Sequence, residues 1–397
     1  MKRRYAEIAG WGMYVPSREV PNDTFVTMGL DTSDEWIASR TGIERRRFVG
    51  PDEATSDMAV KAARQAMAVS GLNAGDVDMV IVATTTPDHV MPATASIVQD
   101  KLGMLGAGAM DLNAACAGFT YALSTAAALV ESGRAKNILV IGADELSIYL
   151  DFRDRSTCVL FGDGAGAVVL RHAKEPGIMG STQGSDGSGA GLLTIPGGGS
   201  RIRTNGKAAN SHNGAGNGSG NGSGNGHQRH RHDGNYLKMN GPQIFRWATQ
   251  IMPRAAEEVM AASGLKPEHI SLFIPHQANN RIMEATAKRL GLPPEKVFSN
   301  VRSYGNTSAA SIPIALCEAL QQDRIHVGDY IVLSSFGAGL TWSALALRWS
   351  VPIPKDVRPW QPIARQVQSR MAAVRSVLRR GDRAVRTQID KTRGKID

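Results

Sequence analysis

The chain has 397 residues, and its content of 42% hydrophobic and 20% charged residues is ordinary for a soluble globular protein. The formal net charge of +9 is concentrated in residues 355–397, which contain twelve lysines and arginines but only four aspartates. The remainder of the chain is therefore nearly neutral, which excludes a nucleic-acid-binding core. The sequence lacks a membrane-spanning run of about 20 apolar residues and a signal-peptide pattern. Its three cysteines form neither a metal-ligand spacing nor a disulfide framework, and this cysteine usage favours the cytoplasm.

Predicted helices and strands alternate along the first part of the chain. Residues 1–17 are expected to hold the first strand, and helical spacing over 56–70 stops at Gly71. Buried strands are predicted at four places: 77–82, 107–112, 137–142 and 167–170. Alternating strands and helices favour parallel or mixed sheets that are covered by helices.

Cys116 is the first candidate functional residue, because it follows the apolar run 107–112 at the start of a helix-like stretch that is expected to end near Gly133. The positive end of a helix dipole would lower the pKa of this thiol, so we expect a thiolate. Small neighbours such as Ala115 and Gly118 leave room for a substrate carbonyl. The alternative is a small hydrophobic residue in the core, which is the usual role of an isolated cysteine.

The sequence repeats itself at an offset of 193 residues. The tripeptide Ser-Gly-Leu precedes a predicted strand at 70–72 and again at 263–265, and the apolar strands at 138–140 and 331–333 keep the same offset. We therefore expect two duplicated α/β halves around one shared site. The predicted division is 1–175, a connector over 176–235, and 236–350.

Two segments depart from this duplicated pattern. Residues 197–235 are rich in Gly, Asn and Ser, which predicts a flexible surface insertion. It contains four histidines, for which a solvated loop is favoured over weak metal binding, and no metal site is predicted: His212, His227, His230 and His232. The extension 351–397 begins with prolines and continues as a basic amphipathic helix, which could contact an anionic membrane surface, bind an acidic protein or dock onto the core.

Three motifs in the second half bear on Cys116. His276 follows a predicted strand, a position at which a lone histidine is more often structural than catalytic. Asn306 lies in a glycine-containing turn before a helix, where it could act as a cap. The turn at 336–339 offers backbone N–H groups that could face a developing oxyanion.

Together, and in this order, these motifs resemble the thiolase superfamily, specifically the β-ketoacyl-[acyl-carrier-protein] synthase III family. The matching stretches are 36–42, the segment around Cys116, Arg155 with 161–167, 275–282, 304–311 and 336–342. The resemblance implies a thiolase-like five-layered αβαβα fold of the α/β class, a homodimer, and an active site at the bottom of a tunnel. The insertion and the C-terminal extension lie outside the family pattern.

The resemblance also implies the chemistry. Cys116 would take the acyl group of an acyl-CoA, and decarboxylation of malonyl-[acyl-carrier-protein] (malonyl-ACP) would supply the carbon nucleophile that gives a 3-oxoacyl-ACP, without a cofactor. His276 Nε2 and Asn306 Nδ2 would stabilise the thioester enolate, and the backbone N–H groups of Cys116 and Ala338 would bind the oxyanion. The family has glycine where this chain has Ala338, so a positive φ there would be strained.

Several contacts with substrates follow from the same resemblance. Trp36 and Arg155 match residues that sandwich the adenine of coenzyme A, and Arg40 matches a phosphate contact. Arg281 matches a basic residue that binds the acidic acyl carrier protein. An exposed arginine that is only solvated is the alternative for each of these.

The acyl pocket is expected to include Met91, Phe161 and Phe245. Met91 stands where the family often has an aromatic residue that reaches across the dimer, and a flexible methionine would leave a roomier pocket. We therefore expect a primer that is longer than acetyl or branched.

Other functions are compatible with the same residue types. A cysteine hydrolase could use His276 as base with Asn306 orienting it, and a non-catalytic binding protein could keep the fold. Related thiolase-fold enzymes transfer acyl groups to alcohols or amines, or condense them in secondary metabolism.

Overall fold

The computed structural model describes residues 4–200 and 235–353. The predictions for most of the Gly/Asn/Ser-rich insertion, including its four histidines, and for nearly all of the basic extension lie outside these residues. In the part of the chain that is described, every helix is too short or too polar to cross a membrane.

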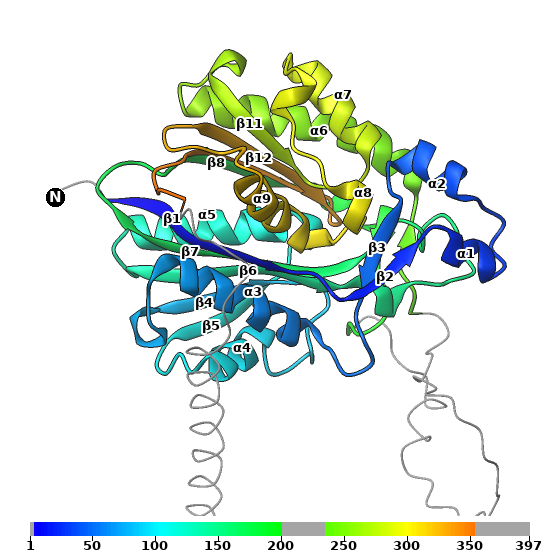
Figure 1. The fold of residues 1–397 in the computed structure, drawn as a ribbon, viewed down its shortest axis with the longest axis horizontal. Coiled ribbons are helices and arrows are strands. Elements are labelled where there is room, and N and C mark those ends of the chain that lie inside the picture. Colours follow the sequence, from blue (N-terminus) through cyan, green and yellow to red (C-terminus); the bar gives the residue numbers. More distant parts are fainter. Residues whose placement is uncertain (1–3, 201–234, 354–397) are drawn as a thin grey trace, which may run out of the picture.

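The described elements stack in five layers, in the order helix, sheet, helix, sheet, helix (Figure 1). From the bottom of the figure to the top, three pairs of helices form the helical layers: α3 (Thr55–Ser70) with α4 (Thr94–Leu102), α5 (Gly118–Glu131) with α9 (Ser311–Gln321), and α6 (Gly241–Ala262) with α7 (Asn280–Leu290). The central pair is enclosed between the two sheets and is apolar on most of its surface. The predicted αβαβα architecture is confirmed.

The first sheet has five strands: β1 (Tyr5–Tyr14), β7 (Asp163–Ala173), β6 (Asn137–Glu145), β4 (Met79–Ala83) and β5 (Gly108–Leu112), in that spatial order. Strand β4 is parallel to β5 and β6, whereas β7 is antiparallel to β1 and β6. The predicted strands are confirmed, with one difference. The run at 107–112 is only half-buried, because β5 is an edge strand with no neighbouring strand on its outer side among the residues that the structure describes.

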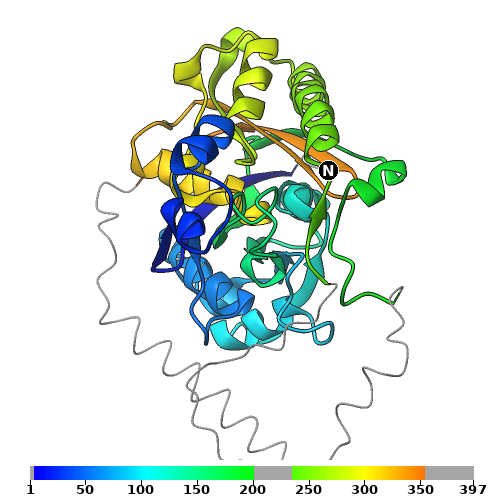
Figure 2. The same ribbon diagram turned by 90° about the vertical axis from the view of Figure 1, so that its right-hand side faces the viewer.

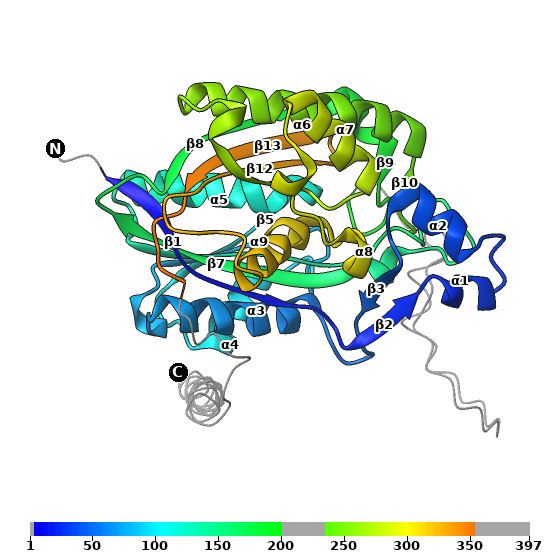
Figure 3. The same ribbon diagram turned by 45° about the horizontal axis from the view of Figure 1, so that its top comes forward.

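The second sheet has four strands: β11 (Ile270–Pro275), β12 (Tyr330–Gly337), β13 (Thr341–Arg348) and β8 (Ile178–Ser185), in that spatial order. Helices α6 and α7 cover its outer face, and Figure 3 shows them in front of β8, β13 and β12. Strand β8 lies within the predicted connector 176–235, so the second sheet takes one strand from before the insertion.

The duplication at an offset of 193 residues is present in the structure. A 3₁₀ turn at Ala115–Ala117 followed by α5 recurs as a 3₁₀ turn at Ser308–Ala310 followed by α9, with both boundaries at that offset. Strand β6 begins at Asn137 and β12 begins at Tyr330, which preserves the offset again. The two halves therefore share the turn that carries Cys116 in the first half.

Shorter elements form a rim at one side of the layers, where α1 and α2 face the viewer in Figure 2. They are α1 (Asp23–Thr27), α2 (Asp34–Thr41), α8 (Val301–Tyr304), the pair β2 (Arg18–Pro21) and β3 (Arg45–Phe48), and the pair β9 (Leu193–Thr194) and β10 (Lys238–Met239). The fully buried guanidinium of Arg46 stabilises this rim, because it donates to the carbonyls of Val20 and Val159 and lies over the ring of Phe25.

Candidate active site

Cys116 lies in the 3₁₀ turn between the end of β5 and the start of α5. The residue before it, Ala115, has φ of 49°, a left-handed conformation that costs energy for any residue other than glycine. This tight turn directs Cys116 into the interior, where the residue is only 8% exposed. The predicted strand–turn–helix around the cysteine is confirmed.

The surroundings of the thiol raise its pKa. Burial raises the pKa of Cys116 to about 12, and the carboxylate of Asp144 adds to this shift, while a hydrogen bond from the Ser308 hydroxyl opposes it. Burial is the largest of these effects on the pKa of the thiol. The expectation of a lowered pKa and a resting thiolate is wrong, and the sulfur keeps its proton before a substrate reacts.

Asn306 lies in the turn of the second half that corresponds to the cysteine turn. Its backbone N–H donates to the carbonyl of Leu160 at 2.8 Å, and its own carbonyl accepts from Gly162 at 3.0 Å, so the turn is fixed to the first half. Its side-chain Oδ1 accepts the backbone N–H of Ser308 at 2.8 Å. The Nδ2 group has no acceptor in the described part of the chain and is therefore available to a ligand.

His276 follows β11 directly and is 1% exposed. Its backbone N–H donates to the carbonyl of Ser334 at 2.8 Å, and its ring packs edge-on against Phe336 with the centroids 5.3 Å apart. Ring atom Nδ1 lies 2.6 Å from Oγ of Ser311, whereas Nε2 is buried without a partner among the described residues. Burial lowers the pKa of His276 to about 3, so the ring is neutral.

The end of β12 brings the second half against the cysteine. A Cβ at Gly337 would lie 2.7 Å from the backbone nitrogen of Cys116, so only glycine allows this approach. Ala338 follows, and it is not one of the three non-glycine residues that have positive φ in the described chain. The left-handed position in this turn is Gly339, with φ of 137°, so alanine at 338 is not strained.

One cavity of about 450 Å³ joins these residues. Cys116 and Phe161 line it from the first half, and Ser308 and Ala338 line it from the second. His276 and Asn306 are not among the lining residues: Asn306 accepts the backbone N–H of Ser308, which lines the cavity, and the His276 ring packs on Phe336, the neighbour of Gly337. The cavity thus joins Cys116 with Ala338, whereas His276 and Asn306 do not line it and are connected to it only through Phe336 and Ser308.

Comparisons with known proteins match both halves. The family model described as 3-oxoacyl-[acyl-carrier-protein (ACP)] synthase III matches residues 110–187, and the model of the C-terminal part of that enzyme matches 260–349. A relative from Roseiflexus castenholzii, β-ketoacyl-[acyl-carrier-protein] synthase III, is 46% identical over 347 residues, which cover 87% of this chain and 98% of the relative. The chain belongs to the 3-oxoacyl-[acyl-carrier-protein] synthase III family.

Solved structures agree with this assignment. The β-ketoacyl-ACP synthase III of Thermus thermophilus is 45% identical, with a TM-score of 0.76 over 87% of this chain and 99% of that one. The priming β-ketosynthase of the R1128 polyketide pathway is 35% identical, with a TM-score of 0.78 over 89% of this chain and 98% of that one. The thiolase-like fold is confirmed, and the chain is a condensing enzyme, an acyltransferase of fatty-acid biosynthesis.

The three residues that were predicted to form the acyl pocket occupy different places. Phe161 lines the cavity beside Cys116. Phe245 is not among the lining residues and instead lies under the guanidinium of Arg281, at 5.3 Å from its ring centroid. Met91 is 86% exposed on the loop between β4 and α4, so it does not contribute to the cavity of its own chain.

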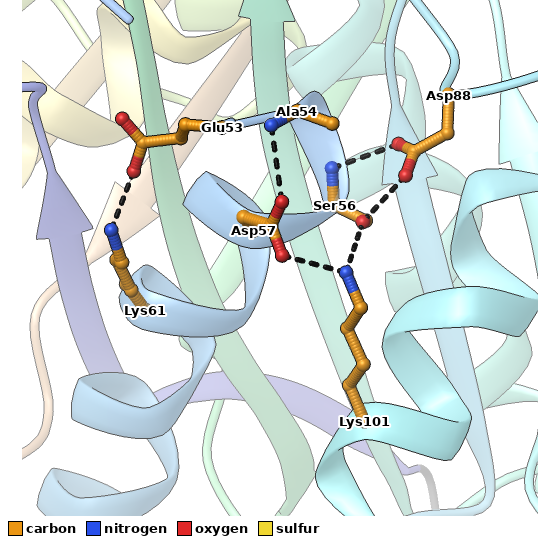
Figure 4. Close-up of polar contacts among 7 residues, drawn as sticks. All are labelled: Glu53, Ala54, Ser56, Asp57, Lys61, Asp88 and Lys101. Atoms are coloured by element: carbon orange, nitrogen blue, oxygen red, sulfur yellow. Dashed lines mark hydrogen bonds and ion pairs between the residues drawn. The ribbon is translucent and has the colours of Figure 1, made fainter. Parts of the chain in front are cut away.

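The base of the loop that carries Met91 is held by polar contacts (Figure 4). Asp88 accepts hydrogen bonds from the backbone N–H and the hydroxyl of Ser56, at the start of α3. Lys101 of α4 donates to that hydroxyl and to Asp57, both at 2.7 Å. The loop therefore presents Met91 from a fixed base that joins α3 to α4.

Three predicted substrate contacts gather at the rim. The guanidinium groups of Arg40 and Arg155 lie 4.9 Å and 5.0 Å from the ring centroid of Trp36 on α2. Arg155 also pairs with Asp31, and at this distance no second ring fits between arginine and tryptophan. Asn279 donates to the carbonyl of Arg40, which joins the start of α7, where Arg281 lies, to α2.

Sequence reasoning missed three polar residues of the site. Ser308 bonds the sulfur, Ser311 bonds His276, and Asp144 acts on the pKa of Cys116. The repeat contained a signal for the two serines, because Ser308 stands 193 residues after Ala115 at the start of the duplicated turn. No comparable sequence signal marks Asp144, whose hydrogen-bond partners come from two segments far from it in the sequence, 84–86 and Ala309.

Proposed function

We propose that the chain condenses an acyl-CoA primer with malonyl-ACP to give a 3-oxoacyl-ACP, CoA and CO₂. The observation that carries the proposal is a pair of side-chain nitrogens without partners, on two residues that connect through Phe336 and Ser308 to the cavity of a buried thiol. His276 uses Nδ1 and Asn306 uses Oδ1 for internal hydrogen bonds, so Nε2 and Nδ2 are both left for a ligand. Two such donors suit a thioester oxygen that becomes negative during the reaction.

In the first step, the Cys116 sulfur attacks the thioester carbonyl of the acyl-CoA. The sulfur–carbon bond to Cys116 forms, the bond to the CoA sulfur breaks, and the proton of the Cys116 thiol ends on the released CoA. The backbone N–H groups of Cys116 and Ala338, which border the same cavity, are assigned to the oxyanion. A thiol with its pKa raised to about 12 must lose its proton as it attacks, rather than beforehand.

In the second step, malonyl-ACP loses CO₂, and the electron pair of the broken carbon–carbon bond forms a thioester enolate. His276 Nε2 and Asn306 Nδ2 are assigned to the enolate oxygen. The enolate carbon attacks acyl-Cys116, the carbon–sulfur bond breaks, and the cysteine sulfur takes up a proton from water. A neutral histidine is the appropriate donor, because decarboxylation needs charge stabilisation at oxygen and no strong base.

The geometry is less consistent with a cysteine hydrolase. In such enzymes an asparagine orients a histidine that acts as base. Here the group at His276 Nδ1 is Ser311, while the Asn306 amide is bonded to Ser308. Burial also lowers the pKa of His276 to about 3, which makes it a weak base at neutral pH.

The test is mass spectrometry of the enzyme after incubation with a mixed pool of C2–C10 acyl-CoAs, followed by malonyl-ACP. We expect one acyl adduct on Cys116 that disappears with the release of CO₂ and a 3-oxoacyl-ACP two carbons longer. Release of free acid without malonyl-ACP would identify a hydrolase and reject the proposal. The preferred adduct also tests the primer, for which we expect a longer or branched chain rather than acetyl.

We also infer that the chain forms a homodimer. The edge strand β5 is half-buried, and Val90 and Met91 on the neighbouring loop are each 86% exposed. Exposed apolar groups beside an unpaired strand edge are typical of an interface. A second copy seated there would bring Met91 to the acyl cavity of its partner. Sedimentation equilibrium tests the dimer, and Met91→Asp should weaken it.

The remaining partners rest on chemistry at the rim and on sequence. Arg40, Arg155 and Arg281 suit the phosphates of CoA and the acidic surface of an acyl carrier protein, and adenine binding requires Arg155 to leave Trp36. A cytoplasmic setting agrees with three cysteines that are all unpaired. For the basic extension we propose contact with an anionic membrane surface or an acidic protein, which sedimentation with anionic liposomes tests by comparing the full chain with a truncation at residue 354.

A further inference from the structure

We propose that Ser311 is a positioning residue: its hydroxyl donates to Nδ1 of His276 and thereby fixes the tautomer in which Nε2 carries the hydrogen. This inference rests on the proposed role of His276 as a donor to the enolate oxygen. A histidine in the other tautomer would present a lone pair to that oxygen and repel it.

The contact between the two side chains is short and shielded. The Ser311 Oγ lies 2.6 Å from His276 Nδ1, and the two residues are 2% and 1% exposed. Ser311 is the first residue of α9, so its backbone is held by the helix. In the described chain, its hydroxyl has His276 as its single hydrogen-bond partner.

Counting donors and acceptors decides the direction of this hydrogen bond. If Ser311 donates, its hydrogen and Nδ1 are both paired, and only the Nε2–H of His276 is left without a partner. If Nδ1 donates instead, the serine hydrogen and the Nε2 lone pair are both left unpaired in a buried place. Buried polar groups without partners are penalised, so the first arrangement is favoured. It leaves one free donor, at the atom that the chemistry requires.

The duplicated first half provides an internal comparison. At an offset of 193 residues, Ala83 corresponds to His276 and Gly118 corresponds to Ser311. These two residues also face each other, because a Cβ added at Gly118 would lie 3.2 Å from the Cβ of Ala83. The half without the histidine therefore also lacks the hydroxyl at the start of the following helix. This is the pattern expected if the serine serves the imidazole rather than the helix.

The direct test is nitrogen NMR of the full chain labelled with ¹⁵N-histidine, with His276→Ala used to assign the ring signals. We expect wild-type His276 to be neutral at pH 7, with hydrogen on Nε2 and an unprotonated Nδ1. In Ser311→Ala we expect a mixture of the two tautomers. A wild-type spectrum with hydrogen on Nδ1 would overturn the proposal whatever the activity of the variants.

The kinetic test separates the two steps of the reaction. For Ser311→Ala we expect acylation of Cys116 by acyl-CoA within about 3-fold of wild type, and condensation with malonyl-ACP slowed about 10-fold to 100-fold. Ser311→Thr keeps the hydroxyl and should restore most of the loss. Ser343→Ala is the matched control, because it removes a buried hydroxyl of β13 that has no partner among the described residues.

Three outcomes of these assays have distinct meanings. A selective loss of condensation in Ser311→Ala that the threonine variant reverses supports the proposal. Equal condensation by wild type and Ser311→Ala, or an equal loss in Ser343→Ala, overturns it. Failure of the wild-type chain itself to condense malonyl-ACP would reject the proposed function instead, and the NMR result would still decide the tautomer.

Discussion

The two halves of the molecule share one turn but have kept different chemical groups. Cys116 of the first half corresponds, at an offset of 193 residues, to Ala309 of the second, and His276 of the second corresponds to Ala83 of the first. Each half therefore has alanine where the other has a reactive side chain. In the proposed mechanism, each half therefore contributes a different group, the nucleophile from the first and a donor from the second, to one site rather than to two.

The asparagines of the two turns make the same backbone hydrogen bond but differ in burial. Asn113 accepts the backbone N–H of Ala115 at 3.1 Å, and Asn306 accepts that of Ser308 at 2.8 Å. Both turns contain a non-glycine residue with positive φ, 49° at Ala115 and 52° at Ser308. Asn113 is exposed, whereas Asn306 is buried. The same structural motif thus supports a turn in both halves, but the remaining amide group is exposed in the first half and buried in the second.

Replacement of the nucleophile should have the largest effect and tests whether the chemistry belongs to one half. For Cys116→Ala we expect no covalent acyl adduct and a loss of at least about 10⁴-fold in condensation from acyl-CoA, because no other cysteine lines the cavity. Intact mass after incubation with acyl-CoA measures the adduct. An adduct of equal yield on Cys158 or Cys317 would contradict the assignment.

The donors of the second half should affect only the second step. For His276→Ala and Asn306→Ala we expect condensation to fall by about 10²-fold to 10³-fold each, since each removes one donor to the enolate oxygen. Acylation of Cys116 should change by less than about 10-fold.

Asn113→Ala is the matched control for Asn306→Ala, because it breaks the same side-chain-to-backbone hydrogen bond in the first half. We expect it to lower stability and to slow acylation slightly, without a selective loss of condensation. Equal losses of condensation in the two variants would show that the turn, and not the free amide of Asn306, matters.

The layered fold could be predicted, and candidate reactive residues could be named, because both leave local patterns in the sequence. An apolar strand, the glycine that ends α3 and each copy of Ser-Gly-Leu can each be recognised within a short stretch of sequence. The pairing of Cys116 with His276 and Asn306 came from the resemblance to a family, since nothing local connects positions so far apart.

The electrostatics of the site could not be predicted in the same way. From its local sequence we considered for Cys116 only the dipole of its own helix, whereas burial and the carboxylate of Asp144, which depend on the tertiary structure, raise the pKa of its thiol. The exposure of Met91 and the position of Phe245 outside the cavity likewise depend on packing between distant segments.

The charge behind the thiol gives a third prediction. Asp144 accepts hydrogen bonds from Thr84, Thr85 and Thr86 and from the backbone of Ala309, so it joins the two halves and also raises the pKa of Cys116. Since a pKa of about 12 lies above the assay range, alkylation of wild type should rise about 10-fold per pH unit between pH 7 and 10. In Asp144→Asn the pKa falls, so alkylation should be several-fold faster at each pH.

The control for this variant is Asp163→Asn, which removes a second buried carboxylate that does not act directly on the sulfur. Iodoacetamide labelling followed by mass spectrometry measures both profiles. If the two variants gave the same profile, the effect would come from loosened packing rather than from the charge of Asp144.

The smallest expected effect concerns the strain in the duplicated turn. Ala115 has φ of 49°, so Ala115→Gly should raise the free energy of unfolding by about 0.5–1 kcal/mol. Its neighbour Ala114 has φ of –136°, where glycine brings no relief, and Ala114→Gly should lower that free energy by about 0.5–1 kcal/mol. Urea denaturation with Cys116 unmodified measures both. If the changes in the free energy of unfolding have opposite signs at these two adjacent alanines, the backbone of the turn that holds Cys116 is strained, and the surrounding packing keeps it in place. Changes of equal sign would contradict this.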